Sequence, residues 1–182
     1  LDRAGIEIED LHQEVVHRRT VRELHLRHPR VARGLEPGVL FLLLLLELLL
    51  KRGAHPNVAD DSGATALMWS VPDRSKIQSL LDHGAAVDAR SETGRTALLV
   101  AASYPGTVDL LRLLLARGAD LRAQDRAGTT ALALAVRSAD VDVVRFLVER
   151  GLNPDTLNPG ARRAALARNY RPTIDYLISK GL

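Results

Sequence analysis

The sequence has no cysteine among its 182 residues. This absence excludes a disulfide framework, a thiol nucleophile and a zinc site built on cysteine thiolates. Aromatic residues are scarce as well, with one Trp, three Tyr and two Phe. Leu and Ala must therefore fill most of the interior, which suits short helices stacked on their neighbours better than one globular centre.

The sequence also lacks the motifs of common catalytic sites. It has no G-x-x-x-x-G-K-[ST] phosphate loop, no G-x-S-x-G elbow and no calcium-loop spacing of acidic residues. Its acidic pairs have structural explanations: Asp60-Asp61 suits the start of a turn, and Asp140 and Asp142 suit the start of a helix. We therefore predict a protein that is not an enzyme and binds no cofactor.

Histidine is concentrated near the N-terminus, where His12, His17, His25 and His28 lie. A zinc site is one interpretation, but no pair has the H-E-x-x-H spacing. We favour solvated histidines on a helix and predict no metal site.

Lysine is rare, so arginine carries most of the net charge of +3 and the pI of about 9.7. We interpret the arginine bias as the result of a GC-rich coding sequence. The chain begins at Leu1 and not at Met, so we expect a fragment or a processed form.

One spacing recurs along the chain. The pairs Gly53 and Thr65, Gly84 and Thr96, and Gly118 and Thr130 are each twelve residues apart, and Ala-Leu follows each Thr. Successive Gly residues at the ends of apolar runs are 31, 34, 33 and 30 residues apart, ending at Gly181. A period of this size is typical of stacked repeats.

Local chemistry explains the spacing. Thr is a good N-cap, so we expect Thr65, Thr96 and Thr130 to begin helices. Gly closes a helix in the left-handed conformation, so each apolar run ends at one. A second Gly, at Gly63, Gly94 or Gly128, suits a turn with positive φ.

These units resemble the ankyrin-repeat family, whose pattern is D-x-x-G-x-T-P-L-H-x-A-A followed by V-V-x-L-L-L and G-A-D-x-N. The matching stretches are DDSGATALMWS, SETGRTALLVAAS and DRAGTTALALAVRS, and the resemblance covers about residues 39–182. It implies an all-α solenoid of stacked antiparallel helix pairs joined by β-turn loops. The style of the repeats is similar to that of bacterial members.

Two departures from the family pattern stand out. The Pro of T-P-L-H is Ala in every copy, and its His is Met68, Leu99 or Ala133. In the family this His ties neighbouring turns together, so we expect these turns to be held less tightly.

The expected layout has two parts. Residues 1–38 form an N-terminal helical cap or a degenerate repeat, with helices near 5–19 and 21–31. Residues 39–182 form the repeat domain: the second helix of a first repeat (39–53), repeats at about 58–88, 89–122 and 123–155, and a C-terminal capping repeat (156–182) whose second helix includes residues 173–178. The inner turns are expected at Pro72-Asp73, Tyr104–Gly106 and Ser138–Asp140.

The leucine-rich stretch at residues 39–53 has three interpretations. A membrane span needs about 20 apolar residues, and this run has twelve with Glu47 among them. A secretory signal is disfavoured by the 38 residues ahead of it and by the lack of a small-residue cleavage site. We favour a repeat helix, and because Leu42 and Leu44 stand where later copies are polar, we expect another segment to cover that face.

The first clean pair, residues 65–83, is two residues shorter than the family spacing, so its first helix must be short. We expect Trp69 in this helix to lie in the core between repeats and not to serve as a platform for a ligand.

The favoured function is a protein–protein interaction module with a concave surface of turns and first helices, as the resemblance implies. Positions between the shared turn residues vary in charge and size, which is typical of a surface without a folding role. The expected partner-binding residues are Asp61, Ser62, Ala64, Glu92, Thr93, Arg95, Tyr104, Arg126, Ala127, Thr129, Arg137 and Ser138.

Two other functions remain open. The N-terminal segment carries Arg18, Arg19, Arg22, Arg27, Arg30 and Arg33, which suits nucleic acid or an anionic surface, but Glu14 and Glu23 interrupt it and no aromatic residue lies there to stack on bases. The chain could instead be a structural spacer that self-associates through residues 39–51. We expect a soluble protein and favour a cytoplasmic location slightly over export. We expect a protein partner and no small-molecule substrate.

Deleting residues 1–36 is expected to cause self-association or precipitation, because several Leu side chains would be left in water at a cost of about 1.5–3 kcal/mol each. Size-exclusion chromatography and a melting curve would measure this. A truncated protein that stays monomeric and equally stable would contradict the cap.

Overall fold

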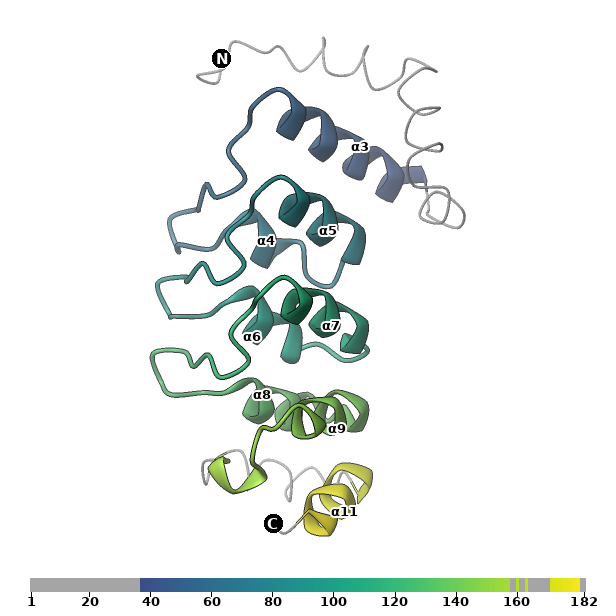
Figure 1. The fold of residues 1–182 in the computed structure, drawn as a ribbon, viewed down its shortest axis with the longest axis vertical. Coiled ribbons are helices and arrows are strands. Elements are labelled where there is room, and N and C mark those ends of the chain that lie inside the picture. The colour runs from purple at the N-terminus through teal and green to yellow at the C-terminus, as the bar shows by residue number, and fades with distance from the viewer. Residues whose placement is uncertain (1–36, 158–159, 161–162, 164–170, 181–182) are drawn as a thin grey trace. The chain divides into compact units, whose positions relative to one another are not determined.

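A computed structural model describes residues 37–157, 160, 163 and 171–180 (Figure 1). The chain divides into two units, Leu1–His55 and Pro56–Leu182. The helices expected at residues 5–19 and 21–31, the four N-terminal histidines and the N-terminal arginines lie outside the described residues.

The described part of the first unit contains one helix, α3 (Pro37–Lys51), followed by Gly53 with a φ of 89°. The left-handed Gly at this helix end confirms the predicted stop. Leu44 is 4% exposed, as expected, but Leu42 is 51% exposed, so the expectation of cover was wrong for Leu42. Among the described residues no helix has the length and apolarity needed to cross a membrane.

The second unit is a stack of helix pairs, and Figure 1 shows its turn loops on one side of the stack. Its described elements are α4 (Ala66–Trp69), α5 (Arg74–Asp82), α6 (Ala97–Ala102), α7 (Val108–Ala116), α8 (Ala131–Ser138), α9 (Val141–Glu149), the 3₁₀ helix η1 (Pro154–Thr156) and α11 (Arg171–Ser179). Apart from helices, the described residues form only isolated bridges, Ala59 with Thr65 and Gln124 with Thr130. The predicted all-α architecture of stacked pairs is confirmed.

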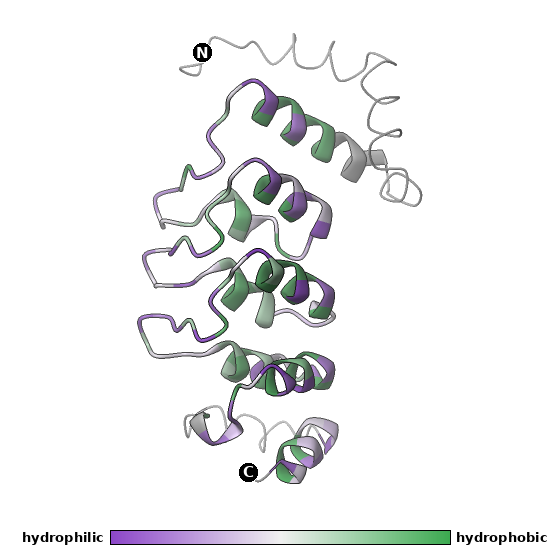
Figure 2. Ribbon diagram, viewed as in Figure 1, coloured by the Kyte–Doolittle hydropathy of each residue, from purple (hydrophilic) through white to green (hydrophobic). Residues whose placement is uncertain are grey.

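The core lies between the helices of successive pairs. Leu98 and Leu99 on α6 and Leu132 on α8 are almost fully buried, and so are Leu111 and Leu114 on α7. Figure 2 shows the hydrophobic residues concentrated on the helices and hydrophilic residues on the turn loops. Each repeat therefore buries its apolar faces against its neighbours, as a solenoid requires.

Side-chain caps fix where the helices begin. The Thr96 hydroxyl accepts from the Leu99 N–H at 3.3 Å and that of Thr130 from the Ala133 N–H at 3.2 Å, as predicted. Thr65 also begins a helix as predicted, because it is the N-cap residue of α4, but its buried hydroxyl has no hydrogen-bond partner. Asp140 caps α9 by accepting from the backbone N–H of Asp142 and Val143, which confirms its structural role.

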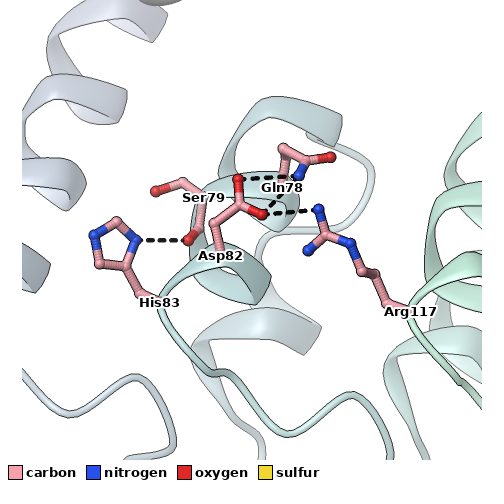
Figure 3. Close-up of polar contacts among 5 residues, drawn as sticks. All are labelled: Gln78, Ser79, Asp82, His83 and Arg117. Carbon is pink, nitrogen blue, oxygen red and sulfur yellow. Dashed lines mark hydrogen bonds and ion pairs between the residues drawn. The ribbon is translucent and has the colours of Figure 1, made fainter.

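The second helices are joined by one polar link on their exposed surface. The carboxylate of Asp82 at the end of α5 accepts from Arg117 at 2.8 Å and from Gln78 at 2.9 Å (Figure 3). Beside it, Nδ1 of His83 lies 2.9 Å from the Ser79 carbonyl oxygen. Because the Asp82–Arg117 pair is exposed, it contributes at most about 1 kcal/mol to the free energy of unfolding. The packing of the stack therefore does not depend on this pair.

Main-chain bonds join consecutive turns. The Glu92 N–H donates to the Ser62 carbonyl at 2.8 Å, and the Arg126 N–H donates to the Thr93 carbonyl at 2.9 Å. A side chain repeats the connection, because Arg90 donates to the Gln124 carbonyl at 2.8 Å. The turns are thus joined without the His of the family pattern.

The close approach of the turns explains two glycines, Gly63 and Gly94. A Cβ at Gly94 would lie 2.9 Å from the Arg126 nitrogen, whereas a Cβ at Gly118 would have no heavy atom within 4 Å. Both have positive φ, 80° and 88°. Gly118 therefore needs only the left-handed backbone, and Gly94 needs the space as well.

Gly94→Ala is expected to lower the free energy of unfolding more than Gly118→Ala. The left-handed backbone costs an L-residue about 1–2 kcal/mol at either position, and only the first variant also pushes the next turn away. Urea denaturation of both variants checks this. Equal losses would show that the turns tolerate separation.

Candidate protein-binding surface

A groove of about 340 Å³ opens between the turn loops and first helices of two consecutive repeats. It is named the Trp69 groove here. Counting from the repeat that begins near residue 58, the first repeat contributes Ser62, Ala64, Met68, Trp69 and Val71, and the second contributes Ser91, Glu92, Thr93, Arg95, Val100 and Tyr104. Six of the twelve predicted partner-binding residues, all from these two repeats, therefore line one groove.

Trp69 corrects a prediction. It was expected in the core between repeats, but it is 71% exposed. The cause is the length of α4, which has four residues and ends at Trp69. At this end of the helix the indole points to the turn, where its Nε1–H donates to Oδ2 of Asp60 at 2.8 Å.

Asp60 organises the turn beside the groove. Its carboxylate accepts from the Ser62 hydroxyl at 2.6 Å and from the backbone N–H groups of Ser62 and Ala64 at 2.8 and 3.0 Å. The Ser62 hydroxyl, followed by the Trp69 indole, lowers the pKa of Asp60 from 3.8 to about 2. Asp60 is therefore ionised at neutral pH and holds both the turn and the indole.

Asp125 has the same role in the third turn, where it accepts from the N–H groups of Ala127 and Thr129 at 2.9 and 2.8 Å. Burial alone would raise the pKa of Asp125, but the bonds from Thr129 and Ala127 and the charge of Arg95 together lower it. The turns thus use acidic side chains to satisfy their own backbone N–H groups.

The groove can bury an apolar side chain. Met68 and Val71 form a buried floor, and the exposed rings of Trp69 and Tyr104 (the latter 45% exposed) stand beside it. Polar turn residues surround this apolar area. Exposed aromatic side chains around a small hollow are typical of sites that take an anchor residue of a partner protein.

The other six predicted residues do not line the groove. Asp61 is exposed on the first turn, and Arg126 and Ala127 are exposed and Thr129 half-buried on the third. Arg137 is exposed at the end of α8, but the Ser138 hydroxyl is half-buried and donates to the Ala135 carbonyl at 2.9 Å. The predicted partner-binding residues of the first two repeats, apart from Asp61, therefore lie together in one groove. Those of the third repeat lie outside this groove.

Sequence reasoning missed the apolar part of the groove, which is Met68, Trp69, Val71 and Val100, and it also missed the polar Ser91. One signal could have indicated it. Pro72 follows three residues after Trp69, so the helix cannot extend and the Trp stands at its end. Among the described residues no group of three or more His, Asp or Glu side chains is placed to hold a metal ion.

The hydrogen bond from the Trp69 indole N–H to Asp60 is expected to break only at low pH. The depressed pKa of Asp60 means that its carboxylate bonds persist above the ordinary value of 3.8 and are lost as pH falls through about 2. The indole N–H resonance in NMR spectra, unique because the chain has one Trp, reports this. A shift centred near the ordinary value, with the helical circular dichroism unchanged, would contradict the Asp60 bond, and Asp60→Asn should abolish the step.

Comparison with known proteins places these repeats in a family. The family described as "Ankyrin repeats (3 copies)" matches residues 42–125, 75–158 and 104–182. The "B-cell lymphoma 3 protein homolog" of Mus musculus is 31% identical over 147 residues, which cover 75% of this chain and 33% of that protein.

Other relatives are similar over shorter segments. The "Putative ankyrin repeat-containing protein" of Treponema pallidum (strain Nichols) is 32% identical over 112 residues, 60% of this chain and 38% of that protein. The "L-asparaginase" of Dirofilaria immitis is 33% identical over 111 residues, 60% of this chain and 19% of that protein. The chain thus spans between about a fifth and two fifths of the length of these relatives.

The relatives come from several kinds of organism, so a bacterial source stays a prediction. The family matches together extend from residue 42 to residue 182, which is well over half of the chain. With its stacked helix pairs and turn loops, this chain belongs to the ankyrin-repeat family.

Proposed function

We propose that this chain is a non-catalytic module that binds another protein through the Trp69 groove and the turns beside it. Ankyrin repeats generally serve as protein-interaction modules, and the groove supplies a place for contact. The observation that carries the proposal is the exposure of Trp69, 71%, next to Tyr104 in one groove.

An exposed Trp side chain leaves apolar surface in contact with water, which is unfavourable in free energy, and binding of a partner would bury that surface. Trp and Tyr bury large areas and lose little side-chain entropy when they do so, which is why they dominate measured hot spots. The Asp60 bond also fixes the indole before any partner arrives. A side chain held in its binding conformation loses less freedom on association, so the groove is preorganised.

One relative is named as an enzyme, the L-asparaginase of Dirofilaria immitis, but we do not propose that activity for this chain. The similarity to the L-asparaginase spans only 19% of that protein. The Trp69 groove is lined by Ser, Thr, Glu and Arg side chains without a histidine beside a nucleophile. This arrangement suits recognition of a partner and gives no nucleophile and base pair.

Self-association is a second candidate, because Leu42 on α3 is a large apolar side chain that is 51% exposed. Light scattering over a concentration series tests it, with Leu42→Ser as the variant. Concentration-dependent oligomers that Leu42→Ser abolishes would favour this function over binding in the groove.

Trp69→Ala, and separately the triple change of Tyr104, Arg95 and Arg126 to Ala, are each expected to weaken partner binding by more than about tenfold. Hot-spot truncations typically cost about 2 kcal/mol or more. The partner is first captured from an extract of the source organism and identified by mass spectrometry. Calorimetry then measures the affinity of each variant, and a melting curve confirms that folding is unchanged.

Two controls make this result interpretable. Ile178→Ala removes an exposed apolar side chain from α11, away from the groove, and should leave the affinity unchanged. Neutralising Arg18, Arg19 and Arg22 should also leave it unchanged. If these arginines prove necessary and Trp69 does not, the partner is held by the N-terminal segment and the proposed function is wrong.

A further inference from the structure

Charged side chains at the tips of three consecutive turns form a row. Asp61, Glu92 and Arg126 occupy the same place in their turns, two residues before Gly63, Gly94 and Gly128. The two bonds between turns, from Glu92 N–H to Ser62 and from Arg126 N–H to Thr93, fix the order of the row. All three charged residues are exposed.

These tip charges are available to a partner. Within the described part of the chain, the side chains of Asp61, Glu92 and Arg126 form no hydrogen bond or ion pair. Asp60 and Asp125 differ, because both are occupied by the N–H groups of their own turns. The acidic groups that shape the turns are thus engaged, and the charges at the tips are not.

Arg95 adds a second positive charge next to the groove. It is exposed, it lines the groove, and its charge acts on Asp125 without a hydrogen bond. The row together with Arg95 therefore has an acidic half, Asp61 and Glu92, and a basic half, Arg95 and Arg126. One residue of each sign, Glu92 and Arg95, lines the groove together with its apolar residues.

We propose that the partner presents a bipolar segment: a large apolar side chain that enters the Trp69 groove, a basic residue on the side of Asp61 and Glu92, and an acidic residue on the side of Arg95 and Arg126. This proposal rests on the proposed function, and it adds the chemistry and the orientation of the partner segment.

Charge complementarity carries the choice of partner. A uniformly acidic segment would meet Asp61 and Glu92, and a uniformly basic one would meet Arg95 and Arg126. Like charges placed opposite each other at an interface are unfavourable and reject wrong partners. Only a segment with both signs satisfies the whole row, and the order of the turns sets its direction.

The size of the effect follows from exposure. Ion pairs at the rim of an interface are solvated and screened, so each contributes little and depends on salt. We therefore expect the apolar anchor to supply most of the affinity and the charges to give a preference of about three- to tenfold at low salt, falling as salt is added.

The test uses short synthetic peptides and the emission of Trp69, the one Trp of the chain. Each peptide is blocked at both ends and carries one Phe between two charged flanks, with no Trp or Tyr. The mixed peptide has Lys on one flank and Glu on the other, and the two controls have Glu on both or Lys on both. A fourth peptide, with Gly in place of Phe, tests the anchor.

The mixed peptide is expected to bind at least about threefold more tightly than either uniform peptide, and the Gly peptide should not change the emission. Two charge-reversal variants should then switch the preference. Arg95→Glu with Arg126→Glu should favour the Lys peptide, and Asp61→Lys with Glu92→Lys should favour the Glu peptide. Melting curves verify that each variant is folded. Because the two variants alter different residues, either variant alone tests whether the peptide preference changes.

The outcomes separate this proposal from the function on which it rests. If all Phe peptides bind equally and neither folded variant switches preference, the bipolar partner is wrong but the apolar groove stands. If no Phe peptide changes the emission of Trp69 at any concentration up to its solubility, both the bipolar partner and the groove as a binding site are wrong.

Discussion

The bonds between consecutive turns are the constraint on which the proposed binding surface depends. Glu92 N–H to Ser62 and Arg126 N–H to Thr93 are main-chain bonds, so they are independent of the side chain at each tip. Asp60 and Asp125 support them by filling their own turns with hydrogen bonds. Because backbone groups hold the turns together, the tip positions are free to vary in charge and size, and a surface for recognition becomes possible without loss of the fold.

A short helix turns this regular stack into a site. In the second and third repeats the first helices, α6 and α8, have six and eight residues, and α4 has four. The shorter α4 leaves Trp69 at its end, where the turn of the same repeat binds the indole through Asp60. The groove is therefore a local irregularity of one repeat, bounded by the regular turn of the next. An irregularity of this kind distinguishes one ankyrin surface from another while the architecture stays constant.

The sequence predicted the architecture well because its causes are local. A Gly at the end of an apolar run and a Thr before Ala-Leu act within a few residues, so their spacing located the helix pairs. Turn residues such as Pro72-Asp73 and Tyr104–Gly106 located the inner turns. Exposure was harder to predict. Trp69 was assigned to the core, but its environment depends on where α4 ends and on the hydrogen bond to Asp60. Turn residues such as Glu92 and Arg95 lie in the turn to which the register assigns them, and their role in binding stays a prediction. Val71 and Val100 look like ordinary core residues until two repeats are brought together.

The central claim, that backbone bonds lock the turns into one rigid row, is tested most directly by amide hydrogen exchange. Glu92 and Arg126 are exposed residues in loops, yet their N–H groups donate to the preceding turn. The account predicts that both amides exchange slowly, with opening free energies that approach that of global unfolding, while the Asp61 amide on the first turn exchanges faster. Exchange of Glu92 and Arg126 at the rate of an unstructured chain would show that the turns are not locked and would contradict the account.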